Sequence, residues 1–170
     1  MNLVTYPNPI LKKKMSPVTT FDKNLRREAF LMSQIMFKHK GLGLSAPQAG
    51  LNKRLIVLNA FELQDFSPRD PILVNPKLHG TFMDGATETD EEGCLSIPGI
   101  YALIERKSNI CVKYKTVRGI EKVMMADGLL ARVIQHELDH LDGKLFIDHL
   151  SKLKLRLLMK KYNPKAIGEL

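Results

Sequence analysis

Apolar residues recur at the spacing of an α-helix in three parts of the chain. The first part follows Asp22, which can cap a helix, and precedes Gly41, which can end one. Its apolar positions are Leu25, Ala29, Phe30, Met32, Ile35, Met36 and Phe37. Residues three and four apart share one side of a helix, so we interpret this stripe as core packing.

A second helical pattern begins after Asp127 and can end at Gly143. Its apolar positions are Leu130, Val133, Ile134, Leu138 and Leu141. A third amphipathic stretch, at about residues 150–162, stops before Pro164, because proline cannot continue a helix. We therefore expect one helix in the interior of the domain and a basic helix near the C-terminus.

Short runs rich in apolar and β-branched residues lie between the first two helices and are typical of strands. They cover residues 55–58, 72–74, 101–104, 110–114 and 120–125. Residues 67–71 and 118–119 have turn composition, and residues 84–94 are acidic and predicted to be irregular. This order predicts one α+β domain over residues 1–170, with mixed or mostly antiparallel sheets packed around a central helix and a C-terminal helix.

Composition narrows the class of protein. The 170 residues are 44% hydrophobic and 26% charged, as in ordinary folded domains. No run approaches the roughly 18 apolar residues of a membrane span, and the N-terminus lacks an apolar run of signal-peptide length. We therefore expect a cytoplasmic protein. Cys94 and Cys111 are too few for a disulfide scaffold.

The net charge of +8 raises the question of nucleic-acid binding. The basic residues are spread along the chain without a recognisable DNA-binding or RNA-binding motif, so we expect no sequence-specific nucleic-acid partner. Residues 151–170 differ, because basic residues far outnumber the single acid, Glu169. The basic residues there are Lys152, Lys154, Arg156, Lys160, Lys161 and Lys165. This segment either docks on an anionic partner or forms a basic amphipathic helix packed on the domain.

Residues 136–140 read H-E-x-x-H and fall inside the second predicted helix. The i, i+4 spacing places His136 and His140 one turn apart on the same face, where two imidazoles can hold one metal ion. Glu137 lies next to the first histidine and is placed to act as a general base. The alternative is a pair of surface histidines without a metal.

The third ligand decides which class of metal site this is. The chain matches the extended metzincin motif as far as Gly143, but has Phe146 where the third histidine belongs, and His149 comes too late. A thermolysin-like site needs a later glutamate, and only Glu169 follows Glu137. Cys94 is the remaining candidate, because a thiolate and two imidazoles leave one tetrahedral position for water.

Three segments resemble, in order and at similar separations, the three motifs of peptide deformylases. They are residues 41–48 (GLGLSAPQ), 92–96 (EGCLS) and 135–141 (QHELDHL), and the similarity extends over about residues 1–150. Two positions depart from the family pattern. Ser45 replaces the first of two small residues, usually alanines, and Tyr101 stands where many bacterial members have an arginine that helps hold the peptide backbone.

The resemblance implies hydrolysis of the N-formyl group of nascent formyl-methionyl polypeptides, releasing formate. It further implies that water on a metal held by Cys94, His136 and His140 attacks the formyl carbon, and that Glu137 moves the proton. The resemblance also implies ferrous iron in the cell, with zinc, nickel or cobalt obtainable in its place, and contact of the basic tail with the ribosome.

Other site residues are assigned on the same basis. The resemblance implies that the Gln48 side chain and the Leu95 backbone N–H stabilise the developing oxyanion. The expected substrate-binding residues are Leu42, Gly43, Gly93, Leu129 and Val133. Glu92 and Asp139 are candidates for orienting the metal ligands.

Two other functions remain open at this point. A zinc endopeptidase can use the same H-E-x-x-H motif. A structural Cys/His metal clamp in a ribosome-binding protein is the alternative outside enzymes. A closed structural site normally has four protein ligands, and no fourth is evident near Cys94 or the helix.

Overall fold

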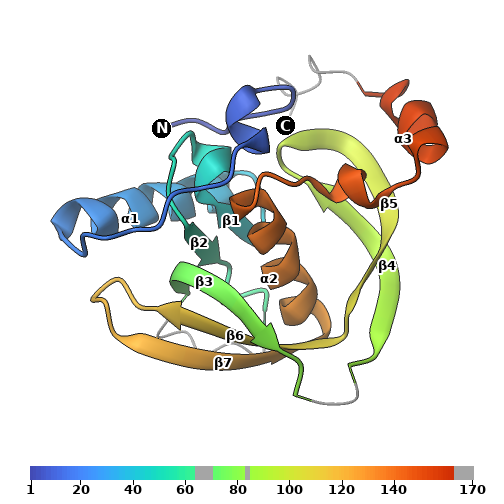
Figure 1. The fold of residues 1–170 in the computed structure, drawn as a ribbon. Coiled ribbons are helices and arrows are strands. Elements are labelled where there is room, and N and C mark those ends of the chain that lie inside the picture. Colours follow the sequence, from blue (N-terminus) through green and yellow to red (C-terminus); the bar gives the residue numbers. More distant parts are fainter. Residues whose placement is uncertain (64–70, 83–84, 163–170) are drawn as a thin grey trace.

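The interior of the molecule is built around helix α2 (Gly128–Leu141), which a five-stranded sheet and a separate two-stranded ribbon flank (Figure 1). The structure is a computed structural model that describes residues 1–63, 71–82 and 85–162. The sheet has the order β1-β2-β3-β6-β7, from Gly43–Ser45, Leu55–Leu58, Ile72–Gly80, Asn109–Lys115 and Glu121–Asp127. The ribbon pairs β4 (Thr87–Cys94) with β5 (Ile97–Lys107). Every strand pairing among the described residues is antiparallel, which confirms the predicted α+β class.

Helix α2 is buried on the face that its apolar spacing predicts. Leu130, Val133, Ile134, Leu138 and Leu141 are all at most 9% exposed and pack with apolar residues of β2, β3 and β6. The helix ends where predicted, because Gly143 adopts φ 74°, a conformation that favours glycine. A methyl group at this position would also lie 2.6 Å from the backbone oxygen of Lys12.

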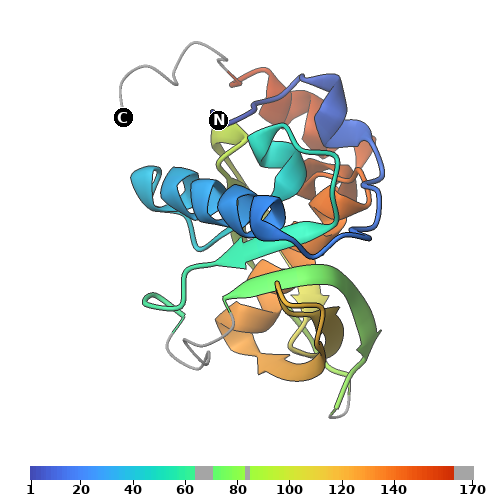
Figure 2. The ribbon, with the colours of Figure 1, turned by 90° about the vertical axis from the view of Figure 1, so that its left-hand side faces the viewer.

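Helix α1 (Lys23–Lys38) covers the β1–β2 side of the sheet (Figure 2). The Asp22 carboxylate caps it by accepting a 2.9 Å hydrogen bond from the Leu25 N–H, as predicted. Gly41 was expected to stop this helix, but the residue in the stop position is Lys40, one residue earlier. Lys40 takes the left-handed conformation (φ 53°), and Gly41 instead closes the last turn with a 2.9 Å bond from its N–H to the Met36 carbonyl.

Two phenylalanines assigned to the core stripe of α1 are exposed instead. Phe30 is 61% and Phe37 is 48% exposed, whereas Ala29 and Met36 are fully buried. Each phenylalanine follows a buried residue by one position, which rotates its side chain by about 100° around the helix axis. The buried apolar face of α1 is therefore narrower than the sequence indicated.

The prediction that residues 84–94 are irregular is wrong over most of its length, because residues 87–94 form β4. The strand carries no apolar alternation and is exposed from Thr87 to Glu91, so the usual sequence signal is missing. Its stability comes from pairing with β5, which places Thr87 opposite Lys107 and Glu88 opposite Arg106.

Two turns were expected elsewhere in the chain. The turn at residues 118–119 is confirmed, with Gly119 at φ 81° between β6 and β7. The turn at residues 67–71 lies almost entirely outside the described residues.

The C-terminal helix α3 (Lys152–Met159) is shorter than predicted and packs on the N-terminal segment. It begins after Ser151, whose hydroxyl accepts a bond from the Lys154 N–H. The apolar residues that pack it onto the domain are Leu155, Leu158, Met159 and Tyr162. The Tyr162 hydroxyl donates a 2.7 Å hydrogen bond to the Tyr6 carbonyl. Residues 163–170 lie outside the described residues, and no described helix is long and apolar enough to cross a membrane.

Candidate active site

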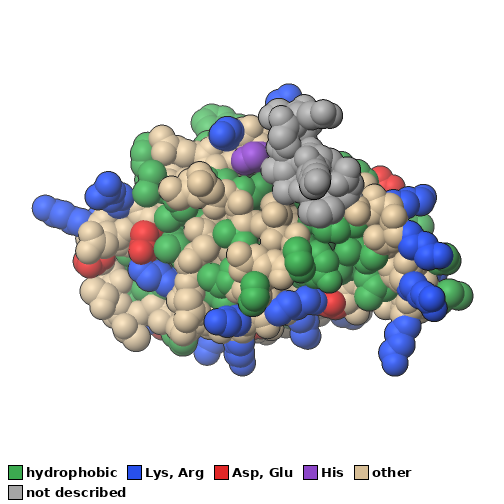
Figure 3. Space-filling model, turned by 90° about the horizontal axis from the view of Figure 1, so that it is seen from above, with side chains coloured by type: hydrophobic (Ala, Val, Ile, Leu, Met, Phe, Trp, Pro, Cys, Tyr) green, Lys and Arg blue, Asp and Glu red, His purple; other side chains and the backbone are tan. Residues whose placement is uncertain are grey.

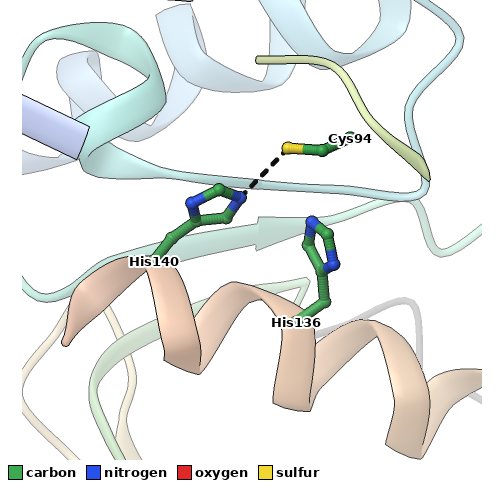
Figure 4. Close-up of side chains that lie close together, drawn as sticks. All are labelled: Cys94, His136 and His140. Atoms are coloured by element: carbon green, nitrogen blue, oxygen red, sulfur yellow. Dashed lines mark hydrogen bonds between the residues drawn. The ribbon is translucent and has the colours of Figure 1, made fainter. Parts of the chain in front are cut away.

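Cys94, His136 and His140 come together although they lie on separate elements. Helix α2 directs both imidazoles to one side, and the end of β4 brings Cys94 over them (Figure 4). The potential ligand atoms of the three side chains all lie within 4.8 Å of one another. The closest pair, Cys94 Sγ and His140 Nε2, is 3.2 Å apart. Both cysteines are free thiols, and Cys111 lies on β6.

The surroundings of the two histidines differ. His136 Nδ1 lies 3.0 Å from Glu92 Oε2, which fixes the orientation of this ring. Burial by itself lowers the pKa of His136, but hydrogen bonds to Cys94 and Glu92 raise it well above its usual range. His140 is fully buried, and burial together with the nearby His136 lowers its pKa well below the usual range. Neutral His140 therefore has a lone pair available for a ligand bond.

Two arginines that the sequence did not single out hold Glu92. The Arg106 guanidinium donates from Nε to Glu92 Oε1 at 2.9 Å and from Nη2 to Oε2 at 3.0 Å. Arg132 Nη1 donates to the same Oε1 at 2.9 Å. Burial alone raises the pKa of Glu92, but the hydrogen bonds from His136 and Arg106 bring it down to about 2.

Glu92 and Asp139 were both candidates for orienting the ligands, and they lie in different positions. Glu92 contacts the candidate ligand His136 directly. Asp139 instead accepts a bond from Arg106 Nη1 at 2.5 Å and lies 2.7 Å from His149 Nε2. Asp139 is therefore connected to His136 indirectly, through Arg106 and Glu92. The sequence signal for Arg106 was its two-residue spacing from buried Ile104 on β5, which places both side chains on one face.

Glu137 lies beside the cysteine and histidines. Its side chain is buried, and Oε2 has no hydrogen-bond partner among the described residues. Burial raises the pKa of this carboxyl. A methyl group at Gly43 would lie 3.0 Å from Glu137 Oε1, so only glycine allows β1 to pass so close to the carboxylate.

The Gln48 side chain is held in one orientation. Its Oε1 accepts hydrogen bonds from the N–H and the hydroxyl of Ser45, both at 2.8 Å. An amide with its oxygen so engaged must point its NH₂ group the other way. Gln48 Nε2 accordingly lies 3.5 Å from Cys94 Sγ.

A cleft of about 550 Å³ opens over these groups. Its lining includes every residue expected to bind substrate: Leu42, Gly43, Gly93, Leu129 and Val133, together with Leu95 and Gln48. The ring of Tyr101 covers Gly93 so closely that a methyl group there would lie 2.6 Å from Cε1. The sequence did not indicate that Lys38, His39 and Lys40, at the end of α1, also line this cleft.

Fold and site together define the class of protein, an α+β domain that presents an H-E-x-x-H helix and a cysteine at a cleft. Residues 1–156 match the family model described as Polypeptide deformylase. The chain therefore belongs to the polypeptide deformylase family, as its three motifs predicted.

Individual relatives agree over almost the whole chain. A peptide deformylase of Rhizobium meliloti (strain 1021) is 40% identical over 165 residues, which cover 96% of this chain and 92% of that protein. The crystal structure of a peptide deformylase from Synechococcus elongatus in complex with actinonin has a TM-score of 0.85 and 40% identity, covering 99% of this chain and 92% of that one. The crystal structure of a peptide deformylase from Legionella pneumophila has a TM-score of 0.85 and 35% identity, covering 94% of this chain and 91% of that one.

Proposed function

We propose that this chain is a metal-dependent hydrolase that removes the N-formyl group from formyl-methionyl nascent polypeptides and releases formate. One observation carries the proposal. Glu137 Oε2, a buried carboxylate oxygen with no hydrogen-bond partner in the described part of the chain, lies at a cleft beside three side chains whose donor atoms are within 4.8 Å of one another. Membership of the polypeptide deformylase family supports the reaction.

The residues present fit a divalent metal. Cys94, His136 and His140 would hold it, and a thiolate with two imidazoles suits iron, zinc, nickel or cobalt. The Glu92 carboxylate, 3.0 Å from His136 Nδ1, adds a negative charge that favours a cation here. When bound, such an ion supplies a nucleophile by lowering the pKa of water from 15.7 to about 7. We assign Fe²⁺ in the cell on the family resemblance.

Glu137 moves the proton in this proposal. Its Oε2 accepts a proton from the attacking water and delivers it to the amine that leaves as the C–N bond breaks. Burial suits this role, because it raises the pKa of Glu137 and makes the carboxyl a better carrier of the proton.

Gln48 Nε2 and the Leu95 backbone N–H stabilise the negative charge that develops on the formyl oxygen. The two bonds from Ser45 fix the Gln48 amide before substrate arrives, so no reorganisation is needed during the reaction. Leu95 follows the ligand Cys94 directly and lines the same cleft.

The cleft suits an extended peptide with an apolar first side chain. Leu42, Leu129 and Val133 provide an apolar lining for methionine. Among the strands that the structure describes, β1 lies at one end of the sheet, so its outer edge can pair with the backbone of a bound peptide. Gly43 on this strand and Gly93 at the end of β4 both line the cleft.

The proposal is tested by measuring formate release from a formyl-methionyl peptide. The protein, purified without oxygen and analysed for its metal, should release formate and leave the unformylated peptide intact. A metal-loaded protein that releases no formate contradicts the proposal. Cleavage of internal bonds in unformylated peptides would instead support the endopeptidase alternative.

We further propose that the basic helix α3 contacts the ribosome. Its exposed Lys152, Lys154 and Arg156 lie on a helix whose other face is packed on the domain. In the view of Figure 3, Lys and Arg side chains are more numerous than Asp and Glu side chains and lie mainly around the margin of the molecule. Replacing these three residues with glutamine should reduce co-sedimentation with ribosomes while leaving formate release unchanged. Unchanged co-sedimentation contradicts this partner. The same replacements at Lys113, Lys115 and Lys122, on β6 and β7, provide the control.

A further inference from the structure

The candidate metal site is assembled from two parts of the fold that no strand pairing connects. Helix α2 carries both histidines, and the β4–β5 ribbon carries Cys94 at its end. Among the described residues, this ribbon pairs only with itself and forms a sheet separate from the five-stranded one. The position of the thiol relative to the imidazoles therefore depends on side chains that join the ribbon to α2.

Arg132 joins the two parts at three acceptors. Its Nη2 donates to the Glu88 carbonyl of β4 at 2.8 Å, and its Nη1 donates to the Ile104 carbonyl of β5 at 2.9 Å. The third acceptor is Glu92 Oε1, at 2.9 Å from Nη1. One guanidinium thus holds both strands of the ribbon and the carboxylate between them.

The same arginine lies one helical turn before the ligand His136. Residues 132 and 136 share a face of α2, and Glu92 bridges them by accepting from Arg132 on Oε1 and contacting His136 Nδ1 through Oε2. Arg132 is 8% exposed and Glu92 is 6% exposed, so solvent does little to weaken this pairing.

We propose that Arg132 is a positioning residue of the metal site, which sets the distance between Cys94 and the two histidines and orients His136 through Glu92. The inference rests on the proposed function, because it presumes a metal at these three ligands. Planarity matters to this role, since a guanidinium can direct its N–H groups to several acceptors at once and an ammonium cannot do so in the same plane.

Gln135 provides a matched control. It also joins α2 to the ribbon, because its Nε2 donates to the Lys107 carbonyl at 2.8 Å and its Oε1 accepts from the Lys107 N–H at 3.1 Å. These bonds lie at the far end of β5 from Cys94. If the loss of any hydrogen bond between α2 and the ribbon disturbed the site, replacing Gln135 would weaken metal binding as much as replacing Arg132.

The test is Co²⁺ binding to the metal-free chain, followed by absorption of the cobalt–thiolate charge-transfer band and by competition with a chelator. Replacing Arg132 with methionine should weaken Co²⁺ binding by about 10–100-fold, the usual effect of losing an outer partner of a metal ligand. The charge-transfer band should also shift or weaken. Gln135→Leu should bind Co²⁺ within about twofold of the original chain, a range that corresponds to roughly 0.4 kcal/mol.

Arg132→Lys keeps the test decisive if the methionine variant does not fold. This variant keeps the positive charge opposite Glu92 but loses the planar set of N–H donors. Its Co²⁺ affinity should therefore lie between those of Arg132→Met and the original chain. If Arg132→Met does not fold, the affinity of Arg132→Lys should still be below that of the original chain. Co²⁺ binding by a folded Arg132 variant that equals that of Gln135→Leu overturns the inference. Failure of the original chain to bind Co²⁺ overturns the proposed metal site instead.

Discussion

Replacing Glu137 with glutamine should lower kcat for formate release by about 10²–10⁴-fold, the usual contribution of a general acid–base group. Glutamine fills the same buried space next to Gly43 but cannot accept the proton of the attacking water. The metal ligands remain in place, so the metal content per chain should not change. Steady-state kinetics on a formyl-methionyl peptide, together with elemental analysis, measures both effects.

Glu91→Gln is the control for this variant. Glu91 lines the same cleft and undergoes the same chemical change, but its side chain is exposed. We expect its kcat to stay within about twofold of the original value, as for most surface substitutions. Retention of full turnover by Glu137→Gln would exclude Glu137 as the proton carrier. A loss of metal together with activity would indicate a structural role instead.

Replacing Cys94 with alanine should remove both the metal and the activity. Only two imidazoles remain in this variant, one fewer than the three protein ligands that catalytic sites of this kind require. The loss of metal affinity should exceed the roughly 10–100-fold effect of removing an outer partner. Metal content after dialysis and formate release after addition of Fe²⁺ or Co²⁺ measure the result.

Cys111→Ala tests whether the effect belongs to this particular thiol. Cys111 lies on β6 opposite Met125 of β7, and it is absent from the donor cluster. This variant should keep its metal and its rate of formate release. A Cys94→Ala protein that retained one metal per chain would show that the site is held by other groups.

The two candidate histidine ligands were predictable because their grouping follows from local helical spacing. His136 and His140 lie one turn apart on any helix, and Glu137 must then lie beside them. Cys94 required an argument by exclusion, since nothing local connects it to the helix. The structure brings its Sγ to 3.2 Å from His140 Nε2, as the end of β4 passes over α2.

The arginines were not predictable on the same grounds. Charged residues within an amphipathic pattern are ordinarily assigned to the solvated face. Arg106 and Arg132 are buried only because β4 and β5 fold across α2 and bring Glu92 between them. The sequence of β4 gives no strand signal, so the element that buries these charges was itself missed.

By itself the sequence determined the buried face of α2, most of the buried face of α1, the helix ends at Asp22 and Gly143, and which side chains are candidates for metal binding and proton transfer. These properties depend on the helical period and on backbone conformations that only some residues favour. Only the tertiary structure decided which charges are buried, how Gln48 faces Cys94, and where the cleft opens. These features depend on contacts between segments far apart in the chain, which no local periodicity specifies.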